Sequence, residues 1–277
     1  MLLVAGPSDA DTSLVGRFNI PSEEKRYGGL SALHMNDAGT GFLAMSDRGE
    51  WFTGTVVRNA DGAIVDLTIT PPQRIKTTVT KGNDRPSRDS EGLAIGPDGE
   101  IYVSFEGVAR VSRFDNLDGM EMPLPRAQDF KGLQGNAGLE ALAIDADGAL
   151  YTIPERSGRF DRPFPVFRYQ DGQWTIPFEI PRTESYLIVG ADFGPDGQLY
   201  ILERDFNGIG FYSRVRRIDL AAGTAETLLE SGLGVHGNLE GISIWENAAG
   251  DTIMTLIADN NFRRLLTNEI AEYRIEG

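Results

Sequence analysis

Apolar and polar positions alternate along this chain in short runs, a pattern typical of β-strands that are buried on one face. Pairs of such runs are separated by a turn containing Asp-Gly or a related glycine-ending sequence, which is the strongest short-range signal for a β-hairpin. Residues 89–106, 138–155 and 187–203 each read as strand, turn and strand, and residues 29–48 and 238–260 follow the same plan more loosely. The sequence therefore contains five related hairpins.

The hairpins recur with a regular spacing. Aligned on their turns, they place the following residues at the same leading position: Ser31, Glu91, Glu140, Val189 and Glu240. The spacings between these residues are 60, 49, 49 and 51. A period near 50 with about four strands per repeat is typical of β-propeller blades. We therefore predict an all-β protein, a single five-bladed β-propeller over residues 1–277, with a six-bladed ring as the alternative. Residues 14–20 are expected to complete the last blade and close the ring.

The leading positions predict a ring of side chains around the propeller axis, because the first strand of each blade lines the centre. Converging glutamates repel one another and raise their pKa values unless a cation neutralises them. Calcium accepts six to eight oxygen ligands in tolerant geometry, so we predict a Ca²⁺ site. Its expected ligands are Ser31, Glu91, Glu140 and Glu240. The alternative is that these glutamates bond to backbone amides or line a wet pore. Val189 offers no side-chain ligand, and nearby Asp192 is a weaker candidate.

A second acidic set ends the second strands of the hairpins, and in several cases an arginine follows. Glu155, Glu203 and Asp259 are candidate general bases for water, with His236 as a candidate proton carrier. The arginines could bind an anionic group in a bidentate fashion. These candidate substrate-binding residues are Arg48, Arg85, Arg88, Arg156 and Arg204. The alternatives are a ring of surface ion pairs for the charged residues and a merely solvated loop for His236.

Composition narrows the possible partners. The net charge of −15 and the pI near 4.6 disfavour nucleic acid and anionic membranes as partners and favour a divalent cation. The absence of cysteine excludes disulfides and thiolate chemistry. No apolar run is long enough for membrane insertion. We expect a monomer that binds a small anionic ester or ligand. We also expect a periplasmic or secreted bacterial protein whose export signal lies outside this sequence, with the cytoplasm as the alternative location.

Four motifs carry a family resemblance: those at residues 89–94, 138–142, 190–204 and 238–242. Together they resemble bacterial phytase-like propellers, the proteins grouped under "esterase-like activity of phytase". The Ser-Glu-Glu-x-Glu ring is also similar to the axial calcium site of five-bladed calcium-activated nucleotidases (apyrases). The resemblance implies a calcium-dependent hydrolase of phosphate or carboxylic esters. A non-catalytic, calcium-stabilised propeller that serves as a binding platform is the alternative, and a lactonase-type propeller is a third possibility.

Overall fold

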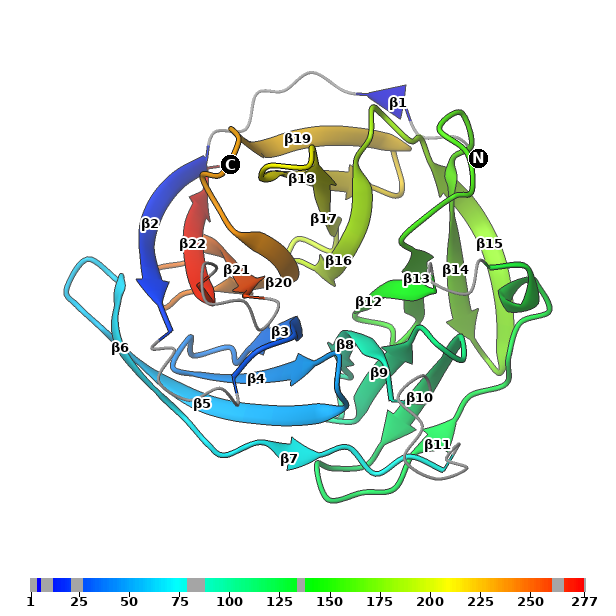
Figure 1. Cartoon of the computed structure of the whole chain (residues 1–277), viewed down its shortest axis with the longest axis horizontal. Helices are drawn as coiled ribbons and strands as arrows, with labels where there is room; N and C mark the ends of the chain where they lie inside the picture. The colour runs from blue at the N-terminus through cyan, green and yellow to red at the C-terminus, as the bar shows by residue number, and fades with distance from the viewer. Residues whose placement is uncertain are drawn as a thin grey trace.

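The structure is a computed structural model that describes residues 4–5, 12–20, 27–78, 88–133, 138–260 and 267–276. Its strands form five mainly antiparallel sheets arranged around a central axis (Figure 1). In each sheet, the innermost strand faces the axis and the following strands lie progressively farther out. The prediction of a five-bladed β-propeller is confirmed.

The blades follow one another along the chain. Blade 1 contains β3 (Leu30–Met35), β4 (Gly41–Ser46), β5 (Glu50–Arg58) and β6 (Ile64–Ile69), with β7 (Gln73–Arg74) paired to β5. Blade 2 contains β8 (Ser90–Ile95), β9 (Ile101–Phe105), β10 (Arg110–Phe114) and β11 (Met122–Pro123). Blade 3 contains β12 (Leu139–Ile144), β13 (Leu150–Pro154), β14 (Phe164–Gln170) and β15 (Gln173–Ile180). Blade 4 contains β16 (Leu187–Phe193), β17 (Leu199–Phe206), β18 (Phe211–Asp219) and β19 (Thr224–Ser231), with β1 (Val4–Ala5) parallel to β19.

Blade 5 combines two distant parts of the chain. Its inner strands are β20 (Asn238–Glu246), β21 (Thr252–Asp259) and β22 (Glu269–Ile275), and its outer strand is β2 (Thr12–Asn19). The segment expected to complete the last blade overlaps β2. An ion pair reinforces this pairing, since Arg17 Nε lies 3.0 Å from Glu269 Oε2. Blade 5 thus joins the two ends of the ring.

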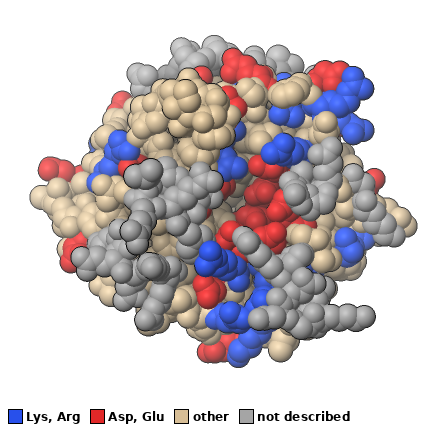
Figure 2. Space-filling model, viewed as in Figure 1, with Lys and Arg blue, Asp and Glu red and all other residues tan. Residues whose placement is uncertain are grey.

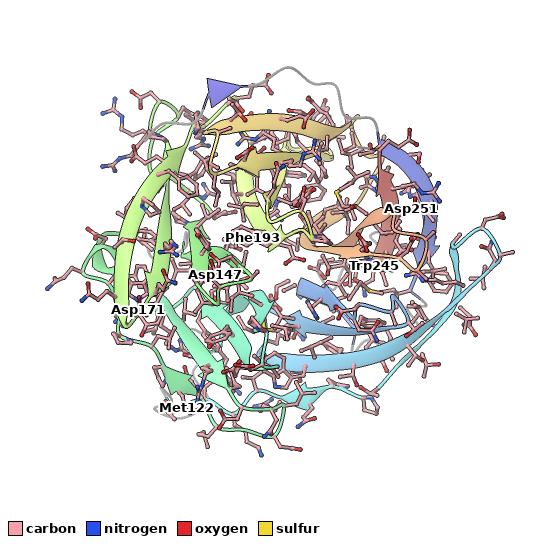
Figure 3. The ribbon with its side chains drawn as sticks, turned by 180° about the vertical axis from the view of Figure 1, so that it is seen from behind. Met122, Asp147, Asp171, Phe193, Trp245 and Asp251 are labelled. Carbon is pink, nitrogen blue, oxygen red and sulfur yellow. The ribbon has the colours of Figure 1, made fainter. Side chains whose placement is uncertain are left out.

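The turn between the first two strands of each blade explains the repeated glycine in the sequence. The amide of this glycine donates a hydrogen bond to the carbonyl three residues earlier, for example from Gly148 to Asp145 at 3.0 Å. The glycine has a positive φ, a left-handed conformation that other residues rarely adopt. The five equivalent residues are Gly39, Gly99, Gly148, Gly197 and Gly250. These turns lie on the face opposite to that of Figure 1, where Figure 3 labels neighbouring residues such as Asp147 and Asp251.

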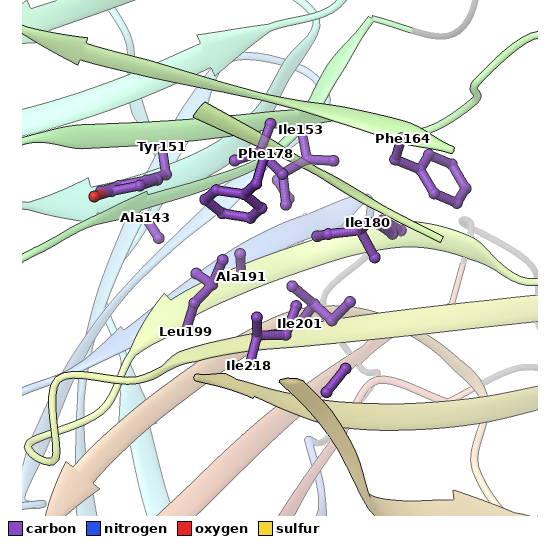
Figure 4. Packing of buried hydrophobic residues seen from close by; sticks show 14 of the residues in the cluster. Ala143, Tyr151, Ile153, Phe164, Phe178, Ile180, Ala191, Leu199, Ile201 and Ile218 are labelled. Atoms are coloured by element: carbon purple, nitrogen blue, oxygen red, sulfur yellow. The ribbon is translucent and has the colours of Figure 1, made fainter. Parts of the chain in front are cut away.

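Each pair of neighbouring blades encloses its own hydrophobic core. Between blades 3 and 4, for instance, Tyr151, Phe164 and Phe178 pack against Leu199 and Ile201 (Figure 4). Four further clusters of this kind fill the other spaces between blades among the described residues. Burying one large apolar side chain stabilises a fold by about 1.5–3 kcal/mol. The ring is thus held together mainly by contacts between blades.

Helical structure is confined, in the described ranges, to a short 3₁₀ turn at Asp129–Gly132. No described helix has the length and apolar character that a membrane crossing requires.

Candidate functional site

The residues of the predicted axial ring share one backbone feature. Every inner strand has an irregularity in its pairing register at the ring position, for example between Leu139 and Ala141 and between Leu239 and Gly241. The ring residues at these irregularities are Ser31, Glu91, Glu140, Val189 and Glu240. A β-bulge re-aims the side chain of the extra residue. The side chains of the five ring residues therefore do not follow the regular alternation between the two faces of a strand.

The residue after each ring position is small because the inner strands approach closely. A Cβ atom on Gly92 would lie 2.7 Å from the carbonyl oxygen of Glu140, in the next blade. A Cβ atom on Gly241 would lie 3.0 Å from the Cα of Ala32. In the same region, Ser31 Oγ donates a hydrogen bond of 2.8 Å to the carbonyl of Ser90. The hydroxyl of this predicted metal ligand therefore joins blade 1 to blade 2.

Carboxylates gather at one end of the axis, and we call this group the axial cluster. Its members are Asp89, Glu91, Glu106, Glu140, Glu155 and Glu240. Electrostatic coupling links these residues to one another across blades 2, 3 and 5. Figure 2 shows acidic side chains near the centre of this face, with Lys and Arg side chains beside them.

Burial and mutual repulsion raise the pKa values of the carboxyl groups in the axial cluster. Burial raises the pKa of Glu91 well above its ordinary range, and the neighbouring carboxylate of Glu140 raises it further. The pKa of Glu140 is likewise raised, by burial and then by Glu155 and Glu240. Burial also raises the pKa of Glu240 to about 7, although Arg204 opposes the change. Glu106 has a pKa of about 7, through burial and the nearby Asp89.

The tightest group within the axial cluster comes from one hairpin. Asp89, Glu91 and Glu106 each place a carboxylate oxygen within 4.8 Å of the others. The β8–β9 pairing explains this geometry, because Ser90 faces Phe105 and so brings the flanking Asp89 and Glu106 together. Glu140 and Glu240 are outside this tight group. The sequence predicted Glu91 as a ligand, but it did not combine Glu91 with Asp89 and Glu106.

Arg204 is the described cation that lies deepest among the carboxylates of the axial cluster. It bonds to Glu240 and Asn238, and its second terminal nitrogen lies 3.4 Å from Glu155 Oε1. Burial alone would lower the pKa of Arg204, but Glu240, Glu155 and Glu140 outweigh burial and raise it. Arg204 was predicted to bind substrate, and in the structure it pairs with these carboxylates.

Glu91 and Glu140 differ from Glu240 in their contacts. Neither carboxylate accepts a hydrogen bond or forms an ion pair within the part of the chain that the structure describes. Buried carboxylates normally pair with a cation, bind a metal or take up a proton. Oxygen donors with excess negative charge are the ligands that calcium prefers. The residues of the axial cluster thus fit a divalent cation in both charge and donor type.

Of the three predicted general bases, Glu155 alone belongs to the axial cluster. Its Oε2 accepts a hydrogen bond of 2.9 Å from Arg156 Nε. Glu203 is fully buried and accepts hydrogen bonds from Arg214 and Arg216, the closest at 2.6 Å. Asp259 accepts from the backbone amides of residues 29 and 30, at 2.6 and 3.2 Å, and it raises the pKa of Glu240 by its charge.

His236 lies away from the axial cluster. It is buried between two residues of β22, with Nδ1 2.8 Å from Glu269 Oε1 and Nε2 2.7 Å from the hydroxyl of Tyr273. β22 is the third strand of its blade, counted from the axis. The surroundings of His236 are those of a residue that links the loop before β20 to this strand.

The remaining predicted arginines occupy different places. Arg156 has a side chain that is 51% exposed beside Glu155. Arg88 lies where blade 1 meets blade 2, since a Cβ atom on Gly49 would lie 3.1 Å from the Cβ of Arg88. Arg48 directly precedes Gly49 in the chain. Arg85 lies outside the described residues.

Asp192 does not join the axial cluster. Its carboxylate accepts hydrogen bonds from the amides of Phe193 and Ile244, at 2.9 and 2.8 Å, and so ties blade 4 to blade 5. Burial raises its pKa to about 7. Sequence alternation alone marked Asp192 as a weaker candidate, which agrees with this separate position.

A cavity of about 410 Å³ opens on the opposite face, between blades 2 and 3. Tyr102, Tyr169 and Met122 line it, together with the exposed turn residues Asp147 and Asp171, three of which are labelled in Figure 3. Its titratable groups are less concentrated than those of the axial cluster. Strongly perturbed carboxylates that converge at one point mark the axial cluster as the better candidate site.

Comparison with known proteins agrees with the fold. The family model for phytase-like proteins, described as "Esterase-like activity of phytase", matches residues 25–262. A search of curated proteins finds no match to the chain. Aldose sugar dehydrogenase from Streptomyces coelicolor, in its PQQ-bound form, has a similar structure with a TM-score of 0.55 and 15% identity, over 98% of this chain and 100% of that one. Virginiamycin B lyase from Staphylococcus aureus has a TM-score of 0.51 and 13% identity, over 95% and 99% of the two chains. At these identities the two structures support the fold alone.

Proposed function

Because this chain belongs to the phytase-like family described by an esterase-like activity, we propose that it is a calcium-dependent hydrolase of phosphate or carboxylic esters. The observation that carries the proposal is the convergence of Asp89, Glu91 and Glu106, whose ligand oxygens lie within 4.8 Å of one another. The buried Glu140, which has no ion pair among the described residues, adds further negative charge beside this group. These residues would hold the ion, which would offset their repulsion and polarise an ester oxygen.

Glu155 is the best-placed residue for proton transfer. It lies beside Glu140, and Arg156 and Arg204 hold its two oxygens in a fixed orientation. A carboxylate in this position can take a proton from a water that attacks the ester, and the proton then passes to the departing alkoxide. The attack forms a bond from the water oxygen to phosphorus or to the carbonyl carbon, and the bond to the alcohol breaks.

A direct assay tests this proposal. Phosphate release from phosphomonoesters and p-nitrophenol release from carboxylic esters are measured with calcium and with a chelator. We expect turnover that requires calcium and that Glu91→Gln reduces at least tenfold, a loss typical of a disrupted metal site. Glu246→Gln is the matched control, because Glu246 is an exposed residue at the end of β20. Wild-type protein without turnover above background across both ester classes would contradict the proposal.

A second candidate function is a propeller whose calcium is structural and whose rim binds a ligand or protein. One observation favours it: two of the three predicted bases, Glu203 and Asp259, are engaged in ion pairs and backbone hydrogen bonds. This candidate predicts a lower melting temperature in chelator without any ester turnover. The two functions are therefore separated by measuring stability and turnover on the same samples.

A further inference from the structure

Arg182 is an arginine on which Glu155 of the axial cluster acts by its charge. It lies in the loop between β15 and β16, and its Nε atom is buried without an acceptor among the described residues. Its guanidinium instead lies over two aromatic rings, 4.5 Å from the centroid of Phe160 and 5.7 Å from that of Phe164. Stacking on aromatic rings holds an arginine in place while leaving its donors available.

The charge of a second guanidinium, that of Arg156, acts on Arg182. Burial lowers the pKa of Arg182, the charge of Arg156 lowers it further, and Glu155 opposes these effects. Arg156 directs its Nε to Glu155, whose other oxygen faces Arg204. Arg156 and Arg204 thus share the carboxylate of Glu155, and the charge of this carboxylate also acts on Arg182. Arg204 is paired with Glu240 as well, so these three arginines face two carboxylates on this side of the axial cluster.

The fold anchors the loop that carries Arg182. The neighbouring Thr183 accepts a hydrogen bond of 2.7 Å from Arg214 through its hydroxyl. Arg214 is in turn fixed by the buried Glu203, at 2.8 Å. The Glu203–Arg214 pair therefore gives the backbone beside Arg182 a defined position. A preorganised arginine loses less conformational entropy when it binds a ligand.

Phe160 adds an apolar surface to the same place. Its side chain remains 72% exposed although one side of the ring is covered by Arg182. Large aromatic residues that stay exposed beside charged groups are frequent in binding sites, where they contact the apolar part of a ligand.

We propose that Arg156 and Arg182 form an oxyanion-binding site, and that Phe160 contacts an aromatic or apolar portion of the bound molecule. The ligand class is an ester or acid that carries a phosphate or carboxylate group next to such a portion. Two planar guanidiniums suit the oxygens of either anion. The identification of this molecule as the substrate rests on the proposed hydrolase function, but the binding site itself does not.

Calorimetry with inorganic phosphate, acetate and phenyl phosphate tests the site without any turnover. Arg182→Gln should raise the Kd for phosphate about tenfold, the effect of losing one charge-assisted contact. Phe160→Ala should weaken the binding of phenyl phosphate but leave the binding of inorganic phosphate unchanged. Arg159→Gln is the control, since Arg159 belongs to the same loop as Phe160, is 78% exposed and pairs with Asp161. Tighter binding of phosphate than of acetate would identify the preferred anion.

Several outcomes would overturn the inference. It fails if wild-type protein binds neither anion, or if Arg182→Gln and Arg159→Gln bind phosphate equally well. Arg156→Gln provides a second variant at an exposed position in case Arg182→Gln does not fold, and it should weaken phosphate binding to a similar degree. Phosphate binding that depends on Arg182 in a protein without esterase turnover would support the site while contradicting the proposed function.

Discussion

Glu240 should make the stability of the metal-free protein depend on pH. Its pKa rises from an ordinary value of 4.5 to about 7 in the folded chain, chiefly through burial. Between these two values the folded protein keeps a proton that the unfolded chain has released. The free energy of unfolding therefore falls as pH rises across this interval. The loss attributable to Glu240 is about 3 kcal/mol, because each pH unit corresponds to about 1.4 kcal/mol for one proton.

Thermal unfolding in the presence of a chelator measures this effect. A loss of this size should lower the melting temperature by roughly 5–10 °C between pH 4.5 and 7.5 in a domain of this length. In Glu240→Gln, the change in melting temperature between these two pH values should be smaller than in the wild type by about the same number of degrees. Glu246→Gln, the exposed control on the same strand, should leave it as in the wild type. Comparing variants with wild type also cancels the titration of distant groups such as His34.

Calcium should oppose this pH dependence. A cation favours the ionised carboxylates, and a ligand at 100 times its Kd stabilises the folded state by about 2.7 kcal/mol. Wild-type melting temperatures in excess calcium should therefore vary less between pH 5 and 8 than in chelator. Equal pH slopes for wild type and Glu240→Gln in chelator would refute the reasoning, because they would show that the Glu240 carboxyl titrates normally in the folded protein.

Further predictions concern the stability of the strands around the axis. Glu203→Gln should reduce the free energy of urea unfolding by about 3–5 kcal/mol, because Arg214 and Arg216 lose their buried partner; an unchanged stability with abolished turnover would instead support a catalytic role. Gly92→Ala should cost about 1–3 kcal/mol through the clash with the next blade, whereas Gly237→Ala, where a Cβ atom would meet its nearest neighbour at 3.5 Å, should cost less. Equal losses for these two glycine variants would contradict the close approach of the inner strands.

The blades could be predicted from the sequence because their signals are local. A glycine that needs a positive φ marks each hairpin turn, and the alternating apolar residues on either side face the cores between blades. Aligning the turns was enough to find the ring positions, although these residues are far apart in the chain. Ring closure by residues near 14–20 required only counting strands.

The composition of the tight carboxylate group could not be obtained in the same way. The alignment considered one position per blade, whereas Asp89, Glu91 and Glu106 come from a single hairpin. Their proximity depends on the register of β8 and β9, with an irregularity next to Glu91. A signal was present, because Asp89 and Glu106 flank the two ends of the predicted hairpin. Because the two ends of a hairpin lie side by side, these flanking residues could have been predicted to lie close together.

The partners of several charged residues depend on packing that sequence spacing does not encode. Glu203 meets arginines of the third strand of its own blade, and Arg204, the next residue, meets carboxylates of two other blades. Two residues that are adjacent in the sequence thus lie in different environments. Arg182 had no motif to mark it, since its position depends on Phe160 and on the anchored loop.

The pairing of β2 with β22 has a consequence for how the protein folds. Arg17 and Glu269, which meet across this pairing, are separated by 252 positions in the chain. Contacts between such distant segments form slowly, because a long loop must close before they contribute any stability. During synthesis, blades 1 to 4 can assemble before β22 has been made. Until then β2 has no partner strand, and its unpaired edge can pair with other strands. The junction in blade 5 should therefore be the last part of the ring to form and the place where aggregation begins when folding is slow.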